Sequence, residues 1–430
     1  MKSQADVVVI GGGIMGSAIA YYLANRKTDV VLLEKGTAGG EQSTRAWGFV
    51  RQQGRDIAEL PLAVAMNRIW PELAAELDAD LEWTQDGVLL VADTEERLQQ
   101  FREWVDASSD YGIGTQIVSG REIHELIPAM QGTFLGGMYT PSDGHAEPTK
   151  VPMAFTNAAR RLGATIYDGC AATGIEVTAG RVTAVHTERG TIHTPIVVCA
   201  AGAWSSRLAR MVGLELPQLV VRATVAETYP VEPVTGIGVA IHGDVAFRQR
   251  PNGSIYMSIL GQSDHELMID SVRYARWFMP NFRLNREFIH VHVNTALVRD
   301  IAHSVPMLPE RLQGADPLSS YESVPARNVV EHARARLGTL IQALGNVPIL
   351  RTWGGKIDMM PDAIPVIGAV DRPTGFILAT GFSGHGFALG PIVGQVVSEL
   401  ILDNQPSIDL HALRFSRFAE RDLAPARAAV

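Results

Sequence analysis

Residues 7–36 read "VVVIGGGIMGSAIAYYLANRKTDVVLLEKG", and this stretch decides the fold. It begins with a short run of β-branched residues, which is typical of a strand buried on both faces of a parallel sheet. A glycine-rich turn follows, and apolar residues then recur at helical spacing before a second apolar run ends in Glu34. The pattern predicts a complete strand–helix–strand unit with the two strands parallel.

The turn carries Gly11, Gly13 and Gly16 at G-x-G-x-x-G spacing. The first glycine permits a tight turn, the second lets backbone approach a pyrophosphate at the helix N-terminus, and the third lets helix and strand pack closely. Glu34 lies where a carboxylate can accept ribose hydroxyls. We therefore interpret the unit as a dinucleotide site rather than a simple tight turn, although this unit alone does not distinguish NAD from FAD.

Composition narrows the function classes. The chain has 430 residues, of which 46% are hydrophobic and 19% charged, enough for two globular domains sharing a large core. Its formal charge is −9 and no basic run is interleaved with aromatic residues, so nucleic acid is not an expected partner. Two cysteines support neither a disulfide framework nor a zinc site, and we expect no metal.

Targeting signals are not evident in the sequence. The chain starts almost directly with a strand, has no signal-type apolar segment, and has no apolar run that we expect to cross a bilayer. These observations predict a cytoplasmic protein.

Two further glycine-containing segments follow predicted strands. Residues 197–205 read "VVCAAGAWS", and residues 375–402 read "GFILATGFSGHGFALGPIVGQVVSELIL". The latter predicts a strand, a glycine loop and a helix with Pro391 in its first turn. A second glycine loop this far from the first suggests that both contact one extended ligand.

Together with "WGGKIDMMPDAIPVIG" at 353–368, these segments resemble the FAD-dependent D-amino acid oxidase superfamily, in its sarcosine oxidase and glycine oxidase-like branch. The resemblance implies an α/β fold of mixed α+β character, in which a Rossmann-like FAD-binding domain is interleaved with a mixed β-sheet substrate domain. We predict that residues 1–80, 145–220 and 346–430 form the FAD-binding domain. Residues 81–144 and 221–345 would form the substrate-binding or cap domain.

The resemblance also implies which residues contact FAD. Backbone N–H groups at the start of the last helix would stabilise negative charge on reduced flavin. Where related sarcosine oxidases carry a flavin-linked cysteine, this chain has a glycine, so we expect non-covalent FAD. The expected cofactor-binding residues are Gly11, Gly13, Ile14, Met15, Gly16, Glu34, Lys35, Ser43, Thr44, Arg45, Ala46, Trp47, Gly48, Ala172, Ala201, Gly202, Trp204, Gly355, Gly381, Ser383, Gly384, His385, Gly386 and Phe387.

Four residues are candidates on the substrate side. Arg51 matches the family position that faces the substrate carboxylate, and its planar fork can bind a carboxylate with two hydrogen bonds. Tyr256, Lys356 and His385 are the other catalytic candidates implied by position. The alternatives are an ion pair for Arg51, a packed strand aromatic for Tyr256 and a solvated lysine for Lys356.

Two departures from the family pattern affect the expected reaction. A lysine that helps to hold the carboxylate in related enzymes is Ala388 here. The oxygen-activating lysine has no evident match in "SILGQSDHELMID", residues 258–270. Oxidase and dehydrogenase activity therefore both remain open, with oxygen or another electron acceptor.

The resulting hypothesis is oxidation of the C–N bond of an amino acid or N-substituted amino acid. A neutral amine nitrogen would help to expel hydride from the adjacent carbon to flavin, giving an imine that water hydrolyses. One alternative is an FAD-dependent 2-hydroxy acid dehydrogenase. Another is a flavin subunit active only with partner chains, in keeping with a possible homo- or hetero-oligomer.

Overall fold

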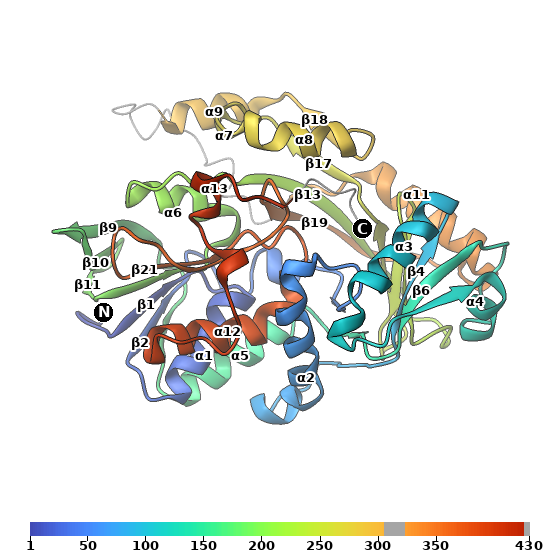
Figure 1. Cartoon of the computed structure of the whole chain (residues 1–430), viewed down its shortest axis with the longest axis horizontal. Helices are drawn as coiled ribbons and strands as arrows, with labels where there is room; N and C mark the ends of the chain where they lie inside the picture. The colour runs from blue at the N-terminus through green and yellow to red at the C-terminus, as the bar shows by residue number, and fades with distance from the viewer. Residues whose placement is uncertain (305–322, 425–430) are drawn as a thin grey trace.

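The computed structural model describes residues 1–304 and 323–424 (Figure 1). Predictions that fall on 305–322 and 425–430 lie outside the described residues. The chain builds two large sheets that lie side by side, one at the left of Figure 1 and one through its centre and right.

The first sheet is the predicted Rossmann-like sheet. Strands β1 and β2, neither of them at an edge, come from the opening stretch and are fully buried, as their unbroken apolar sequence requires. Every neighbouring pair is parallel except the last pair, β21 and β20. The strand order is β8 (Thr165–Tyr167), β2 (Val30–Leu33), β1 (Val7–Ile10), β12 (Ile196–Cys199), β21 (Phe376–Thr380) and β20 (Val366–Ala369).

Helices cover one face of this sheet (Figure 1). They are α1 (Ile14–Asn25), α5 (Val151–Arg161) and α12 (Gly386–Asp403), and α2 (Leu60–Leu77) packs against α12. α1 and α12 approach closely because α12 presents glycines to α1: a Cβ added at Gly390 would lie 2.2 Å from Cγ1 of Ile14. The opposite face carries α6 (Ser205–Met211) and a meander of β9 (Ala172–Thr178), β10 (Arg181–Thr187) and β11 (Gly190–His193).

Helix α12 corrects two sequence expectations. It begins at Gly386, so Pro391 lies in its second turn rather than its first, because the glycine loop ends earlier than the proline suggested. Among the described residues, α12 is also the one helix long and apolar enough to span a membrane, and 67% of that stretch is buried in the protein. Its packing against α1 and α2 accounts for its apolar sequence.

The second sheet is mixed and has ten strands. Its two longest strands, β13 and β19, are antiparallel and run through the centre of Figure 1. The strands are β4 (Val88–Ala92), β5 (Gln116–Ser119), β6 (Gly136–Thr140), β13 (Leu219–Thr228), β14 (Gly238–Ile241), β15 (Val245–Gln249), β16 (Ile255–Ile259), β17 (Ser263–Glu266), β18 (Ile289–His292) and β19 (Ile349–Met359). The combination of a parallel sheet and a large mixed sheet confirms the predicted fold class.

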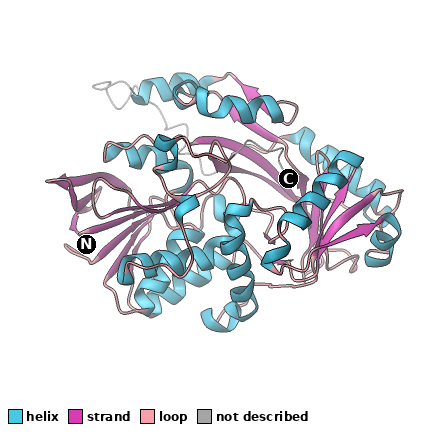
Figure 2. Ribbon diagram, viewed as in Figure 1, coloured by secondary structure: helices cyan, strands magenta, loops and turns pink. Residues whose placement is uncertain are grey.

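Alternation along these strands separates two faces. Leu89 and Val239 pack with α11 (Arg327–Leu340) in one apolar core, whereas their neighbours Leu90 and Ala240 point to the opposite face. Figure 2 shows α3 (Glu95–Ala107), α4 (Gly120–Leu126) and α11 beside this sheet. The face away from α11 is partly covered by α3, whose Leu98 and Phe101 pack in one cluster with Leu90 and Ala240, and it also contributes Leu90 and Ala240 to the cavity described below.

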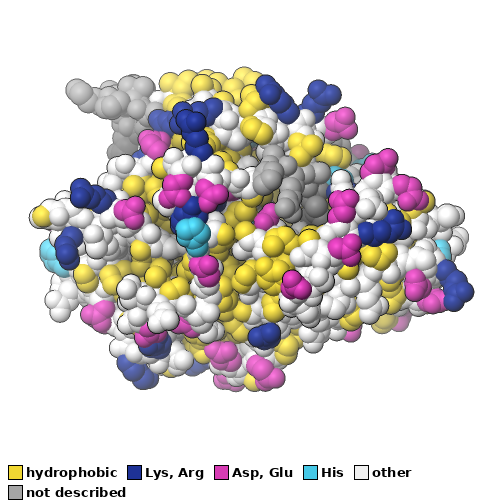
Figure 3. All heavy atoms as spheres, in the orientation of Figure 1, with side chains coloured by type: hydrophobic (Ala, Val, Ile, Leu, Met, Phe, Trp, Pro, Cys, Tyr) yellow, Lys and Arg dark blue, Asp and Glu magenta, His cyan; other side chains and the backbone are white. Residues whose placement is uncertain are grey.

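A group of short elements lies along the upper edge of the molecule (Figure 1). It comprises α7 (Ile269–Arg273), α8 (Ala275–Asn285), β18 and α9 (Thr295–Ser304). Figure 3 shows hydrophobic side chains along this edge, and among them Val272 is 69% and Leu284 53% exposed.

The predicted segments interleave in space. Residues 346–430 contribute β20 and β21 to the first sheet but β19 to the second. The small antiparallel pair β3 (Phe49–Val50) and β7 (Gly144–His145) belongs to neither large sheet. The short helix α13 (Arg417–Glu420) follows α12 near the end of the chain. The division of the chain into two domains at the stated bounds stays a prediction.

Candidate active site

A cavity of about 900 Å³ lies where the glycine turns meet the large sheet. Its walls come from segments far apart in sequence: the first glycine turn, residues 39–55, the end of β12, β19 and the loop before α12. The predicted site residues that line it are Gly11, Gly13, Ile14, Met15, Glu34, Lys35, Ser43, Arg45, Ala46, Trp47, Gly48, Arg51, Ala172, Ala201, Gly202, Trp204, Gly355, Lys356, Ser383, Gly384, His385, Gly386 and Phe387.

Four predicted residues lie outside this lining: Gly16, Thr44, Tyr256 and Gly381. Gly16 has a packing role instead, because a Cβ there would lie 1.8 Å from the carbonyl oxygen of Gly11. Gly381 adopts a φ of +77° and turns the chain after β21. These two glycines therefore set the shape of the two glycine turns without lining the cavity themselves.

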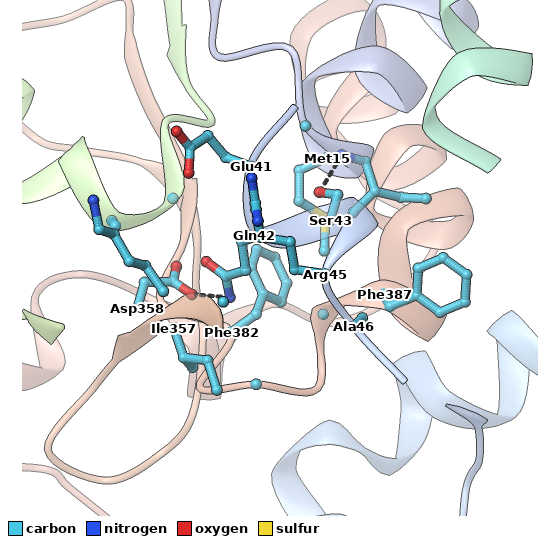
Figure 4. Close-up of a pocket in the computed structure, with 18 of the residues that line it drawn as sticks. Met15, Glu41, Gln42, Ser43, Arg45, Ala46, Ile357, Asp358, Phe382 and Phe387 are labelled. Atoms are coloured by element: carbon cyan, nitrogen blue, oxygen red, sulfur yellow. Dashed lines mark hydrogen bonds between the residues drawn. The ribbon is translucent and has the colours of Figure 1, made fainter. Parts of the chain in front are cut away.

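The first glycine turn has the geometry of a cradle. A Cβ at Gly11 would lie 2.3 Å from the carbonyl oxygen of Ala200 at the end of β12, so only glycine fits there. The Ser43 hydroxyl accepts the backbone N–H of Ile14 at 2.8 Å, which fixes residues 42–44 across the start of α1 (Figure 4). Glu34 accepts the N–H groups of Gly12 and Gly36, each at 2.7 Å, and thereby holds the turn beside β2.

Buried polar atoms in the lining fit a polar extended ligand. Among the described residues, Oε1 of Glu41 and Nε1 of Trp204 are buried and have no hydrogen-bond partner, although both side chains line the cavity. A buried polar atom without a partner is costly, so these atoms indicate that a ligand completes the site. The cradle and these unsatisfied atoms together fit FAD, which has ribose, pyrophosphate and ring-edge polar groups along its length.

Asp358 anchors the second glycine loop. Its carboxylate accepts the backbone N–H of Gly381 at 2.7 Å and the side-chain amide of Gln42 at 2.8 Å, and its backbone carbonyl accepts the N–H of Ser383 at 2.9 Å. Figure 4 shows Gln42 and Asp358 pointing toward one another across the cavity wall. Burial raises the pKa of Asp358, and hydrogen bonds from Gln42 and Gly381 oppose that shift.

Lys356 lies near the indole of Trp204. Its Nζ is 5.6 Å from the centre of that ring, and Nζ of Lys35 is 3.4 Å from the same centre. The three residues line one part of the cavity. The solvated-lysine alternative does not apply, because Lys356 is 7% exposed.

Arg51 projects from a tightly held turn after β3. The turn is fixed by Asp143, whose carboxylate accepts the backbone N–H of Gln52 at 2.9 Å and that of Gln53 at 3.3 Å. The side-chain amide of Gln53 donates to the carbonyl of Val88 at 2.5 Å and so ties the turn to β4. Arg51 and Arg55 both reach the cavity from this segment.

The surroundings of these two arginines shift several pKa values. Burial, reinforced by the charge of Arg55, lowers the pKa of Arg51 to about 9. Burial raises the pKa of Glu59 to about 8 against the opposing effect of Arg55. Burial also raises the pKa of Asp143 to about 6, although the backbone of Gln52 opposes that shift. Of these two carboxyls, Glu59 is therefore held in its neutral form near pH 7.

His385 connects this cluster to the start of α12. Its Nε2 lies 3.1 Å from the carbonyl oxygen of Ala363, so this nitrogen carries the proton of the neutral ring. Its Nδ1 lies 3.3 Å from Oε1 of Glu59. Burial and the charges of Arg55 and Arg51 hold the pKa of His385 well below its usual value, so the imidazole stays neutral.

Tyr256 lies in a separate buried network. Its hydroxyl donates to Glu147 at 3.2 Å and accepts from Arg351 at 3.1 Å, while the guanidinium of Arg248 lies 4.6 Å from the ring centre. This is the geometry of the packed-aromatic alternative. A role for Tyr256 on the substrate side stays a prediction.

Sequence reasoning missed several residues of the site: Glu41, Gln42, Glu59, Asp143 and Asp358. Glu59 and Asp143 lie outside the lining. Both carboxyls act on the pKa of Arg51, and Glu59 also lies next to His385; only the fold brings them near. Asp358 could have been found, because it lies within the 353–368 segment that carried the resemblance.

Comparison with known protein families agrees with a site for FAD. The family model described as "FAD dependent oxidoreductase", named DAO, matches residues 6–400. The chain is 27% identical over 426 residues to mitochondrial sarcosine dehydrogenase from Mus musculus, covering 97% of this chain but only 42% of that protein. This chain therefore spans less than half the length of that relative.

Two other similar proteins match over nearly their full length. Glycine oxidase from Bacillus subtilis is 26% identical, with 97% of this chain and 98% of the relative covered. The solved structure of L-amino acid deaminase from Proteus vulgaris has a TM-score of 0.89 and 25% identity, with 97% of this chain and 98% of that chain covered.

Proposed function

This chain belongs to the DAO family of FAD-dependent oxidoreductases, and from that premise we propose that it oxidises the C–N bond of an amino acid or N-substituted amino acid. The observation that carries the proposal is the position of Arg51. It is a buried arginine on a fixed turn, and it lines the same cavity as both glycine loops. An arginine so placed can orient a carboxylate beside the cofactor.

The proposed roles divide among the segments around the cavity. Gly11, Gly13, Glu34 and Ser43 would hold the nucleotide end of non-covalently bound FAD, and the loop before α12 would approach the pyrimidine edge of the flavin. Bound FAD supplies the hydride acceptor. Arg51, with Arg55 beside it, would hold the substrate carboxylate.

The proposed oxidation needs no side-chain base, because the substrate amine is bound in its neutral form. As hydride leaves the α-carbon, the lone pair of a neutral amine nitrogen forms the C=N bond, giving an iminium. Water then adds to that carbon and the C–N bond breaks. The products are a keto acid and ammonia or an amine. The two cationic arginines favour the neutral amine, because nearby positive charge lowers the pKa of an ammonium group.

The printed names of the relatives support an amino acid or amine substrate, since they include sarcosine dehydrogenase, glycine oxidase and L-amino acid deaminase. We also propose that the reduced flavin passes its electrons to oxygen or another acceptor. We further propose that the protein is cytoplasmic. A 2-hydroxy acid would present the same carboxylate to Arg51 and is the second candidate.

The test is to pair each amino acid with its hydroxy acid analogue and follow flavin absorbance without oxygen. Bleaching by amino acids alone supports C–N oxidation. Bleaching by hydroxy acids alone would replace it with the second candidate. A protein that bleaches only after a co-purifying partner chain is added would instead be the flavin subunit of a larger complex.

A further inference from the structure

The cavity extends beyond the residues expected to contact FAD. Its far wall is formed by Phe49, Val88, Leu90, Ala240 and Leu260, which we call the apolar wall. Phe49, Leu90, Ala240 and Leu260 belong to one hydrophobic cluster, and Val88 begins the same strand as Leu90. None of these five residues was among those predicted to contact FAD, although Trp47, which was, packs against the same cluster.

The sheet register places these side chains together. Val88 and Leu90 alternate with Leu89 along β4, and Leu90 pairs with Ala240 of the neighbouring strand β14. Phe49 packs over the same strand, because a Cβ added at Gly238 would lie 2.5 Å from its ring. The result is a flat apolar surface on the cavity side of the large sheet.

The apolar wall lies next to residues 51–55, the segment after β3 that carries Arg51 and Arg55, which we call the arginine turn. The amide of Gln53 donates to the carbonyl of Val88, and Arg51 donates to the carbonyl of Gln53 at 3.1 Å. A carboxylate on Arg51 would therefore place a substrate's side chain beside this wall.

Charge in this part of the cavity selects against ionised side chains. The acidic residues of the lining are Glu34, Glu41, Glu188 and Asp358, and none comes from the segments that build the apolar wall or the arginine turn. Within the described residues, a lysine-like side chain at the apolar wall would therefore meet no carboxylate of the cavity lining.

A second carboxylate is also disfavoured at the apolar wall, because the side chains of Phe49, Val88, Leu90, Ala240 and Leu260 carry no hydrogen-bond donor. A dicarboxylic substrate would have to bury its distal charge against carbon atoms there.

Resting on the proposed function, we infer that the substrate is an amino acid with a large apolar side chain, held between Arg51 and the apolar wall. Glycine, lysine and dicarboxylic amino acids are poor substrates. Each buried methylene contributes roughly fourfold in affinity, so a leucine-sized side chain gains on the order of 50-fold over alanine.

Binding can be measured separately from turnover. The FAD-loaded protein is titrated calorimetrically with acetate, propionate, butyrate, 4-methylpentanoate and glutarate, which carry the carboxylate but no amine. Affinity should rise several-fold with each added carbon, and glutarate should bind more weakly than 4-methylpentanoate. A flat series, or tighter binding of glutarate, overturns the inference.

A matched pair of variants locates the effect. Leu90→Ala enlarges the cavity and should lower the affinity for 4-methylpentanoate about tenfold or more while leaving acetate unchanged. Leu89→Ala removes the same atoms from the next residue on the opposite face, where it is fully buried, and should leave both affinities unchanged. Equal effects of the two variants would contradict the assignment.

The two proposals fail separately. If the chain-length trend holds but no amino acid bleaches the flavin, the apolar pocket stands and C–N oxidation falls. If amino acids bleach the flavin but glycine or lysine is fastest, the oxidation stands and the pocket assignment falls.

Discussion

Single residues at the arginine turn carry the most specific expectations. Replacing Arg51 with Met removes charge-assisted hydrogen bonds to a carboxylate, each worth about 1.5–3 kcal/mol. KM for an amino acid should therefore rise about 10- to 100-fold, with kcat changed less and FAD absorbance retained. Steady-state kinetics check this, and Arg68→Met, at an exposed position on α2, is the control. Unchanged KM would remove Arg51 from substrate binding.

Glu59 gives a prediction about stability and pH. Its pKa in the folded protein, about 8, lies above its ordinary value near 4.5. Between those values the unfolded chain releases a proton that the folded protein keeps, so the free energy of unfolding falls as pH rises. Glu59→Gln removes this loss and keeps the size of the side chain.

The measurement is urea denaturation of both proteins at pH 5.5 and pH 8. The Gln variant should gain stability relative to the parent protein between these values. Neutral His385 affects both proteins equally and cancels in the difference. Parallel profiles would show that Glu59 is ionised in the folded protein.

At the scale of elements, the second glycine loop depends on β19. Asp358→Ala leaves the N–H of Gly381 and the amide of Gln42 without their acceptor, so the loop before α12 loses its anchor. FAD affinity should fall on the order of tenfold, as two hydrogen bonds that order the site are lost. Flavin fluorescence after dilution measures release, with the exposed Asp371→Ala as control. Equal retention of FAD would mean that the loop holds its shape alone.

Elements were predictable where their signals are local. The periodicity of residues 7–36 contains both strands and the helix, and the structure places β1, α1 and β2 there. Distant pairings were not predictable: Asp143 fixes a turn 90 residues earlier in the chain, and no local pattern records that contact. The residues of the apolar wall were missed for the same reason, since alternation reveals two faces but not which one meets a cavity.

At the scale of the whole molecule, the cavity is lined by residues of both sheets. Because only the folded chain brings these residues together, the ligand should bind the folded state far better than the unfolded chain. Removing FAD should then lower Tm, and adding it back should restore Tm in a concentration-dependent way. Differential scanning fluorimetry of the stripped and reloaded protein checks this. A Tm that does not respond to FAD would mean that the cavity does not hold it.

The most direct test of C–N oxidation is the visible spectrum of the FAD-loaded protein under anaerobic conditions, recorded as leucine and then its 2-hydroxy analogue are added. We expect leucine to bleach the flavin band and the hydroxy acid to leave it unchanged. A flavin band that persists with leucine and with every other amino acid tested would contradict it.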